Sequence, residues 1–296
     1  MAKKTLLVLN RKSAAREDVR NAVKASSEKI DVVIPWNRKA LQKAVDHALS
    51  KGVTRIVAGG GDGTLNKVAN AILQSNDQNV EMGLIPLGTA NDFARSWGDA
   101  GTDIARSLTA ARTEPARLID IGRINGRAFV NVASGGFGAM ITATTDRDLK
   151  RRVGGLAYSV TGLARLSELT ATPTRIVIDD APARSVAMLA LIVGNNRYAG
   201  GGFDVAPEAD LSDGFLDLGL MTLDGLTPGS ERVSKWLDPN DKTSGLIDRV
   251  KFRKAVIETE TPFHLNLDGE PLVDTHFEFQ VEPQTLNFVV PRRFQI

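Results

Sequence analysis

The chain has 296 residues, of which 42% are hydrophobic and 24% charged. This composition is typical of globular proteins, and the length suggests two domains. The formal net charge is only +2, which is too small an excess for a dedicated nucleic-acid-binding protein, so we expect no nucleic-acid partner. The chain contains no cysteine, which excludes disulfides, thiolate metal sites and cysteine nucleophiles.

No segment is typical of a secreted or membrane-spanning protein. The opening residues, MAKKTLLVLN, hold too few apolar side chains for a signal peptide. The longest apolar run, 186–193, is too short to cross a bilayer. We therefore expect a soluble, cytoplasmic protein that meets any lipid at a surface, as a peripheral protein at the inner membrane face.

The first 120 residues alternate between strand-like and helix-like segments. We expect strands at 5–10, 31–36, 54–61 and 82–88, and helices at 14–26, 38–51 and 65–73. The last of these helices has apolar residues at intervals of three and four, and Gly52 stands where the helix before it ends. This order predicts an α/β domain over residues 1–120, with a doubly wound, mostly parallel sheet and helices on both faces.

The pattern changes in the second half of the chain. Asn125-Gly126 joins two strand-like segments, and this dipeptide is the strongest short-range signal for a hairpin. Further strands are expected at 174–179, 185–194, 215–221, 254–260, 263–268, 276–282 and 286–291, and helices at 139–146, 156–169 and 230–237. The pattern predicts a C-terminal antiparallel β-sandwich domain over residues 121–285. The last segment, 286–296, is a candidate for joining the first domain.

A glycine-rich loop connects the third predicted strand to the helix after it. Its sequence is Gly59-Gly60-Gly61-Asp62-Gly63-Thr64. Glycine permits positive φ and lets a ligand approach bare backbone N–H groups, and the start of the following helix offers unpaired donors to a phosphate. The alternative is a tight turn without a ligand, although three consecutive glycines cost backbone entropy that a plain turn rarely requires.

The charge of the expected ligand restricts this site further. A helix N-terminus supplies about half a positive charge, whereas a nucleoside triphosphate carries about four negative charges, which Mg²⁺ and basic side chains usually neutralise. Asp62 is placed to meet such a metal, directly or through water. Asp62 as the N-cap of its helix is the alternative.

A second loop of similar design follows the fourth predicted strand. Its sequence is Pro86-Leu87-Gly88-Thr89-Ala90-Asn91-Asp92-Phe93. Ligands of open α/β sheets bind at the carboxyl ends of the strands. We therefore expect the two loops to face one crevice.

The two loops together carry a family resemblance. GGGDGT at 59–64 followed by PLGTANDFAR at 86–95 resembles the diacylglycerol-kinase-type catalytic domain, and the chain is most similar to the bacterial YegS-type lipid kinases. NAD kinases and phosphofructokinases carry versions of GGDGT alone, so the pair is the more specific signal. The resemblance continues through NVASGGFG at 131–138, Gly194-Asn195, AGGG at 199–202, Pro207 with DLSDG at 210–214, and DGE at 268–270.

This resemblance implies a lipid kinase that transfers the γ-phosphoryl group of ATP to a lipid hydroxyl, with phosphatidylglycerol or diacylglycerol-like lipids as acceptors. It assigns ATP binding to Gly59, Gly60, Gly61, Asp62, Gly63, Thr64, Leu65 and Thr89. Glu270 is the implied general base, with Asp268 beside it. A metal site, for Mg²⁺ or structural Ca²⁺, maps to Asp210, Asp213 and the backbone of Phe215. Without the family, a solvent-exposed hairpin turn is the favoured explanation of Asp268-Gly269. Asp210 and Asp213 are compatible with a hard cation and equally with turn chemistry.

The chain departs from the family pattern at several positions. The usual NPxSG-like turn is Asn10-Arg11-Lys12-Ser13, a proline (Pro35) stands where a nucleotide-contacting threonine is common, and Lys67 replaces a glutamate. These departures motivate one alternative function, a nucleotide-binding regulator without catalysis. The other alternative is an NAD-kinase-like kinase of small molecules.

One basic run is a candidate for membrane contact. Arg147, Lys150, Arg151 and Arg152 precede an apolar-rich stretch at 153–169. A basic run beside an amphipathic helix binds anionic membranes in some proteins, but a solvated helix face is the commoner explanation. The three histidines lack metal-binding spacing.

Overall fold

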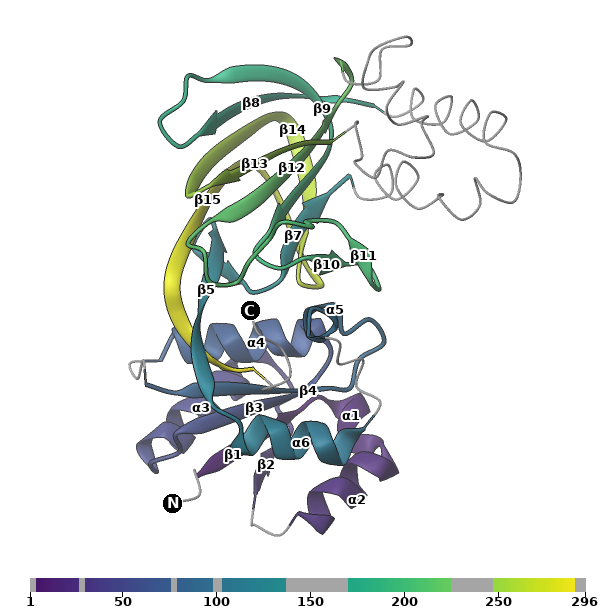
Figure 1. Ribbon diagram of the computed structural model, residues 1–296, viewed down its shortest axis with the longest axis vertical. Helices are drawn as coiled ribbons and strands as arrows, with labels where there is room; N and C mark the ends of the chain where they lie inside the picture. Colours follow the sequence, from purple (N-terminus) through teal and green to yellow (C-terminus); the bar gives the residue numbers. More distant parts are fainter. Residues whose placement is uncertain are drawn as a thin grey trace, which may run out of the picture. The chain divides into compact units, whose positions relative to one another are not determined.

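A computed structural model of the chain describes residues 4–26, 30–75, 79–97, 103–136, 170–224 and 247–290 (Figure 1). The chain forms two compact units. The first unit comprises Met1–Asn131, Asn195–Phe215 and Val281–Ile296, and the second comprises Val132–Gly194 and Leu216–Gln280. The chain leaves the first unit after Asn131, beyond the boundary that the sequence suggested near residue 120, and returns to it twice. The second return, Val281–Ile296, includes the segment 286–296 that was a candidate for joining the first domain, whereas the sequence did not suggest the first return, Asn195–Phe215.

The first unit is built on a parallel sheet. Its strands are β1 (Thr5–Leu9), β2 (Asp31–Val33), β3 (Arg55–Gly60), β4 (Glu81–Pro86) and the end of β15 (Glu270–Val289). They pair in the order β15-β4-β3-β1-β2, and each of these pairings is parallel. All their carboxyl ends therefore lie at one edge of the sheet, which is where the sequence predicted the two ligand loops.

Helices cover both faces of this sheet. The helices of the first unit are α1 (Arg11–Ala15), α2 (Glu17–Ala25), α3 (Arg38–Ser50), α4 (Asp62–Leu73), α5 (Asp92–Arg95) and α6 (Ile104–Thr113). Apolar side chains of α3 and α4 share one buried cluster with Leu6, Val8 and Ile56, whereas α2 and α6 contribute to a second cluster with Leu7 and Val57. Because successive strand residues point to opposite faces, the continuous apolar strands supply both clusters, and the doubly wound arrangement is present.

The predicted helix at 14–26 is two helices. Arg16 is both the C-cap of α1 and the N-cap of α2, and its extended backbone (φ −72°, ψ 131°) separates the two helices. α1 starts at Asn10, whose side chain accepts the N–H of Ser13. The helix therefore begins directly at the end of β1, because Asn is a strong N-cap.

The Asn125-Gly126 turn joins β5 (Ala116–Ile124) to β6 (Arg127–Phe129), as predicted. Both turn residues have positive φ, 47° and 77°, as the tight hairpin turn requires. Side chains of α4 hold this hairpin, since Asn66 and Asn70 both donate to the carbonyl oxygen of Ala128 at 3.0 Å. A two-stranded sheet of β10 (Tyr198–Ala199) and β11 (Phe203–Asp204) completes the first unit.

The second unit is antiparallel. Its strands are β7 (Val132–Gly135), β8 (Thr172–Ile178), β9 (Arg184–Gly194), β12 (Leu216–Thr222), β13 (Ile247–Phe252), β14 (Lys254–Leu267) and the start of β15. They follow the order β13-β12-β9-β7-β14-β15, and β8 pairs with both β14 and β9. The antiparallel pairing that the sequence predicted for this region is confirmed in the described strands.

Two pairs of predicted strands are single long strands. The segments predicted at 254–260 and 263–268 both lie in β14, and those at 276–282 and 286–291 fall along β15. Pro262 and Pro283 lie within these strands, although proline cannot donate to a ladder. In the structure the pairing register shifts between Glu258 and Phe263, so that the strand passes the first proline through an irregularity.

Three predicted helices, at 139–146, 156–169 and 230–237, lie outside the described residues, as does the basic run beginning at Arg147. Among the residues that the structure does describe, no helix is both long and apolar enough to traverse a bilayer.

Candidate active site

The glycine-rich loop lies between β3 and α4, at the carboxyl edge of the parallel sheet. Gly61 is the N-cap of α4 and offers no side-chain hydrogen bond. The N–H groups of Thr64 and Leu65 donate to the carbonyl oxygen of Gly61, at 2.8 and 3.0 Å. Within the described part of the chain, the N–H groups of Asp62 and Gly63 donate to no protein acceptor. Two helix-terminal donors are thus left for an anion.

The structure gives the glycines of this loop a different use from the expected one. None of Gly59, Gly60 and Gly61 has positive φ. A Cβ at Gly59 would collide with the side chain of Leu9, and one at Gly60 with the side chains of Thr64 and Asn10. The glycines are therefore needed for close internal packing, and the run of glycines is not by itself a sign of a ligand.

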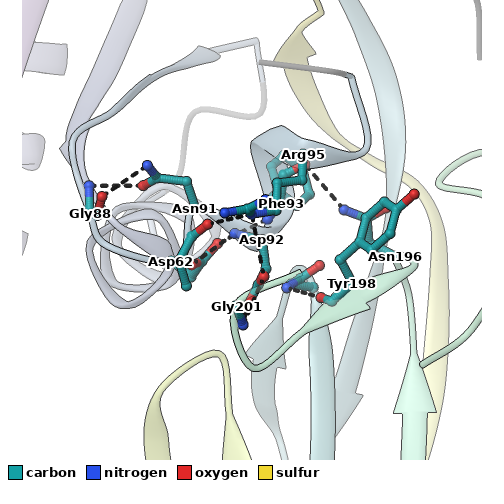
Figure 2. Close-up of polar contacts among 11 residues, drawn as sticks. Asp62, Gly88, Asn91, Asp92, Phe93, Arg95, Asn196, Tyr198 and Gly201 are labelled. Atoms are coloured by element: carbon teal, nitrogen blue, oxygen red, sulfur yellow. Dashed lines mark hydrogen bonds and ion pairs between the residues drawn. The ribbon is translucent and has the colours of Figure 1, made fainter. Parts of the chain in front are cut away.

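Asp62 caps a helix other than its own, as Figure 2 shows. Its carboxylate oxygens accept the N–H groups of Asp92 at 3.1 Å and Phe93 at 3.0 Å, which are the first two residues of α5. The expected alternative, in which Asp62 is the N-cap of α4, is wrong because Gly61 occupies that position. The carboxylate instead fastens the second loop to the first.

The second loop is shaped by Asn91 (Figure 2). Asn91 adopts a left-handed backbone (φ 50°), and its side chain accepts the N–H of Gly88 at 2.8 Å and donates to the Gly88 carbonyl at 2.9 Å. The N–H of Leu87 donates to the carbonyl of Gly60 at 2.9 Å. Thr89, at the tip of this loop, is exposed. The structure thus brings Thr89 and the glycine-rich loop to neighbouring strand ends.

Asp92 is a buried carboxylate for which the sequence indicated no individual role. Its two oxygens accept the N–H of Gly201, at 3.1 and 3.0 Å (Figure 2). Burial raises the pKa of Asp92 above its ordinary value, the Asp62 carboxylate raises the pKa further, and the Gly201 amide and Arg95 act in the opposite direction. The glycine run at 199–202 was the only sequence signal for this contact, because the partners are 109 residues apart.

A second contact ties the same segment to α5. The side chain of Asn196 accepts a hydrogen bond from the Ser96 hydroxyl at 2.6 Å and donates to the Phe93 carbonyl at 3.4 Å. Asn131 donates to the carbonyl of Tyr198 at 2.8 Å. Residues 195–201 therefore hold the second loop from one side, while Asp62 holds it from the other.

The predicted catalytic pair lies in the second unit, at the turn between β14 and β15. Asp268 and Gly269 have positive φ, 49° and 93°, so the dipeptide is a hairpin turn. Asp268 is nevertheless buried, with 5% of its surface exposed, and its carboxylate accepts the N–H of Val132 at 2.8 Å. Glu270 is half-buried at the first position of β15. Asp268 and Gly269 thus form a hairpin turn, but the Asp268 side chain is buried and hydrogen-bonded and is not exposed to solvent.

The predicted metal-site residues form a tight turn in the first unit. Asp210 accepts the N–H and the hydroxyl of Ser212, at 2.9 and 2.8 Å. Asp213 accepts the N–H of Phe215 at 3.0 Å. Within the described residues there is no group of three or more histidine, cysteine, aspartate or glutamate side chains arranged to hold a metal ion.

A third carboxylate, Asp120, lies near this turn and was not identified from the sequence. It is fully buried and accepts the N–H groups of Gly214 at 2.6 Å and Gln284 at 2.8 Å. Burial raises the pKa of Asp120, the two N–H donors lower it, and the nearby carboxylates of Asp213 and Asp210 raise it. Asp120 therefore anchors the turn to β5 and β15 through hydrogen bonds.

The second unit contains a cavity of about 460 Å³. Its lining is largely apolar and includes Ile176, Ile178, Leu218, Leu220 and Val250, with Arg184 and Asp248 among the polar residues. Ile176 and Ile178 pair with Ile257 and Ala255, whereas the Asp268 turn follows the far end of β14. The cavity is thus distant from Glu270 along this strand.

Comparison with known proteins covers both units. The family model described as the diacylglycerol kinase catalytic domain matches residues 4–124, and the model of the YegS C-terminal NAD kinase beta sandwich-like domain matches residues 131–290. A protein of Alcanivorax borkumensis named "Probable lipid kinase YegS-like" is 36% identical over 98% of this chain and 98% of its own length. A protein of Pseudomonas aeruginosa with the same name is 38% identical over 97% of this chain and 94% of its own.

Solved structures agree on the fold. "A putative diacylglycerol kinase from Bacillus anthracis str. Sterne" has a TM-score of 0.75 and 21% identity, covering 99% of each chain. An NAD kinase from Archaeoglobus fulgidus in complex with ATP has a TM-score of 0.53 and 12% identity, covering 98% of this chain and 95% of that one. At these identities the structural likeness concerns the fold alone.

Proposed function

The chain belongs to the YegS-like lipid kinase family and is therefore a kinase, and we propose that it transfers the γ-phosphoryl group of ATP to a lipid hydroxyl. Phosphatidylglycerol and diacylglycerol-like lipids are the proposed acceptors. The observation that carries the proposal is the pair of α4 N–H groups, Asp62 and Gly63, that donate to no acceptor among the described residues. They lie at the sheet edge where α/β folds bind ligands.

We assign the phosphates of ATP to the loop from Gly59 to Leu65, with Thr89 contacting the nucleotide from the second loop. The packing of Gly61 against Gly88 and the bonds from Asp62 to α5 support this assignment, because they fix both loops before a ligand arrives. Phosphoryl transfer depends mainly on alignment and on stabilising charge in the transition state. Rigid backbone donors supply both without side-chain rearrangement.

Glu270 is the proposed general base. The lipid hydroxyl oxygen bonds to the γ-phosphorus, the hydroxyl proton passes to the Glu270 carboxylate, and the bond from the γ-phosphorus to the ADP oxygen breaks. Asp268, whose carboxylate is bonded to the Val132 amide, is proposed to position the turn that carries Glu270. It is buried and already accepts a hydrogen bond, which suits a positioning role.

Mg²⁺ is proposed to accompany the nucleotide, because the phosphate charge exceeds what a helix terminus neutralises. For the second site, Asp210, Asp213 and the Phe215 carbonyl offer three oxygen ligands, whereas Mg²⁺ or Ca²⁺ requires six to eight. Water would have to supply the remainder. The described side chains make no closed metal site, so no step of the transfer is assigned to an ion there.

An NAD-kinase-like function is the second candidate, because the NAD kinase of Archaeoglobus fulgidus has the same fold. The lipid assignment is favoured by the two relatives named as lipid kinases, which match this chain over nearly its full length.

The decisive experiment supplies radiolabelled ATP and magnesium to the full chain with total lipid extract, with phosphatidylglycerol or diacylglycerol vesicles, and with soluble NAD. We expect label in a lipid product and none in NAD. Glu270→Gln is expected to lower turnover about 10²- to 10⁴-fold while ATP binding is retained. Glu260→Gln, an exposed glutamate on the same hairpin, is the matched control and should behave as wild type.

Two results would overturn the proposal. Label transferred to NAD and not to lipid would establish the small-molecule alternative. No turnover by the wild type on any acceptor, with ATP still bound, would establish a nucleotide-binding regulator.

A further inference from the structure

A side-chain hydrogen bond joins the end of β1 to the glycine-rich loop. The NH₂ group of Asn10 donates to the hydroxyl oxygen of Thr64 at 2.9 Å, and both residues are partly buried. The two residues are 54 positions apart, but Leu9 pairs with Gly59, and the N–H of Asn10 donates to the Gly59 carbonyl oxygen at 3.4 Å. The pairing of β1 with β3 therefore places the Asn10 side chain beside the first turn of α4.

A second contact fixes the orientation of the Asn10 amide. Its carbonyl oxygen accepts the N–H of Ser13 at 2.8 Å, because Asn10 is the N-cap of α1. An amide oxygen only accepts hydrogen bonds and an amide nitrogen only donates them, so the group cannot turn over without losing both contacts. The atom that faces Thr64 is therefore the nitrogen, and it contacts the hydroxyl as a donor.

This donor determines what the Thr64 hydroxyl can do. A hydroxyl group has one proton and two lone pairs. Since Asn10 occupies a lone pair, the proton points elsewhere, and within the described part of the chain it reaches no protein acceptor. Thr64 is the third residue of α4, directly after Asp62 and Gly63, whose N–H groups are likewise left for an anion. The hydroxyl thus adds a third donor to the same helix start.

Gly60 makes room for this contact. A Cβ at Gly60 would collide with the Thr64 hydroxyl and would come within 2.7 Å of the Asn10 side-chain nitrogen. Any larger residue at this position would therefore push the two side chains apart. The glycine and the hydrogen bond belong to one arrangement, which sets the position of the Thr64 hydroxyl at the carboxyl edge of the sheet.

We propose that Asn10 is a positioning residue of the phosphate site, and that its amide holds the Thr64 hydroxyl with its proton directed at a phosphate oxygen of the nucleotide. This role rests on the proposed function, because it takes the bound anion to be the triphosphate of ATP. A charged oxygen suits this donor, since hydrogen bonds to ionised acceptors are about twice as strong as neutral ones. Asn10 acts on the ligand through Thr64 and is assigned no contact of its own.

The test measures the affinity of the full chain for ATP and magnesium by calorimetry. Asn10→Asp keeps an N-cap and a hydrogen bond to Thr64, but it reverses the direction of that bond, because a carboxylate only accepts. The Thr64 proton then turns away from the phosphates, and we expect ATP affinity to fall more than about tenfold. Thr64→Val should lower the affinity about tenfold. Thr64→Ser, which keeps the hydroxyl, should bind ATP as wild type.

A double-mutant cycle separates the effect of the hydroxyl from that of the added charge. The carboxylate introduced by Asn10→Asp repels the phosphates with or without the Thr64 hydroxyl, so this repulsion cancels in the cycle. We expect Asn10→Asp to weaken ATP binding about tenfold more in the wild-type background than in Thr64→Val.

A matched variant controls for the change of cap. Asn37→Asp makes the same substitution at the N-cap of α3, where the side chain accepts the N–H of Ala40 at 2.8 Å. Asparagine and aspartate cap helices equally well, so the melting temperatures of Asn37→Asp and Asn10→Asp should both match that of the wild type.

The outcomes distinguish this role from the proposed function. Equal weakening of ATP binding by Asn10→Asp in both backgrounds would overturn the role of Asn10, because the Thr64 hydroxyl would then play no part. So would a lower melting temperature of Asn10→Asp with wild-type ATP affinity, which is the result expected of a purely structural bond. A wild type that binds no ATP would overturn the role and the proposed function together. The expected coupling without transfer to any lipid would support the role and contradict the proposed lipid transfer alone.

Discussion

Gly61 and Gly88 lie backbone to backbone: a Cβ at Gly88 would come within 2.5 Å of the Cα of Gly61. The two residues belong to loops that follow neighbouring parallel strands. Their contact sets the separation of the two loops, and with it the direction of the α4 N–H groups. The geometry of the site therefore requires that neither residue has a Cβ atom.

Gly88→Ala should damage the site without touching a ligand. The added methyl group must displace the Gly61 backbone, and overpacking of this kind costs about 1–3 kcal/mol. We expect a lower melting temperature and weaker ATP binding by calorimetry. Wild-type stability together with wild-type affinity would show that the two loops are not held by this contact.

Asp62→Asn should loosen α5. Asp62 uses both oxygens to accept two N–H groups, and asparagine has one oxygen, so one donor loses its partner at about 1–2 kcal/mol. Asp103→Asn is the matched control, because the Asp103 N-cap accepts a single N–H, from Arg106, and asparagine caps equally well. Denaturant unfolding gives the free energy of unfolding of each variant. If both variants are equally stable, Asp62 does not cap α5 as described.

Arg55→Met should destabilise the first unit strongly. Arg55 is 1% exposed, its guanidinium is 2.6 Å from the Glu81 carboxylate, and it also donates to the carbonyls of Ala111 and Glu114. Removing one partner of a buried ion pair costs about 3–5 kcal/mol. The double variant Arg55→Met, Glu81→Met should recover part of this loss in urea unfolding. A double variant less stable than the single one would contradict the explanation.

His276 should titrate above its ordinary range. Its ring bonds to Glu278 at 3.0 Å and lies 3.4 Å from Glu258, and these contacts raise the pKa of His276, with the Glu278 hydrogen bond as the larger cause. The protonated ring stabilises the fold fully below about pH 6.5, and this contribution is lost as the pH rises through the higher folded value.

Proton NMR titration checks the His276 prediction. Glu278→Gln should lower the pKa of His276, and His276→Gln should remove a pH-dependent stability of about 0.2–1 kcal/mol, typical of exposed pairs. An unchanged His276 titration in Glu278→Gln would contradict the assigned cause.

The sequence predicted those elements whose signals are local. The apolar period of α3 and α4 and the Asn125-Gly126 turn are carried by residues a few positions apart, and the structure confirms them within a few residues. The continuous apolar strands of the first unit are likewise confirmed, because each supplies side chains to both faces of the sheet.

The remainder depends on contacts between distant residues. Nothing near Asp62 indicated that it would cap α5, 30 residues later, or that Gly201 would bond to Asp92. In the sequence, Gly59 and Gly60 suggested a loop that a ligand approaches closely. The structure shows that the side chains of Leu9 and Thr64 pack against these glycines and leave no room for a Cβ atom. The roles of Glu270, Asp268, Asp210 and Asp213 rest on family resemblance, and they stay predictions.

β15 has a consequence for the order in which the protein matures. Its early residues complete the second unit by pairing with β14, and its last residues, Asn287 and Phe288, supply the strand beside β4 in the first. The sheet that begins at Thr5 thus receives a strand from residues that follow the whole second unit in the chain. The first unit cannot complete its sheet until these residues have been synthesised, although its other strands come much earlier in the chain.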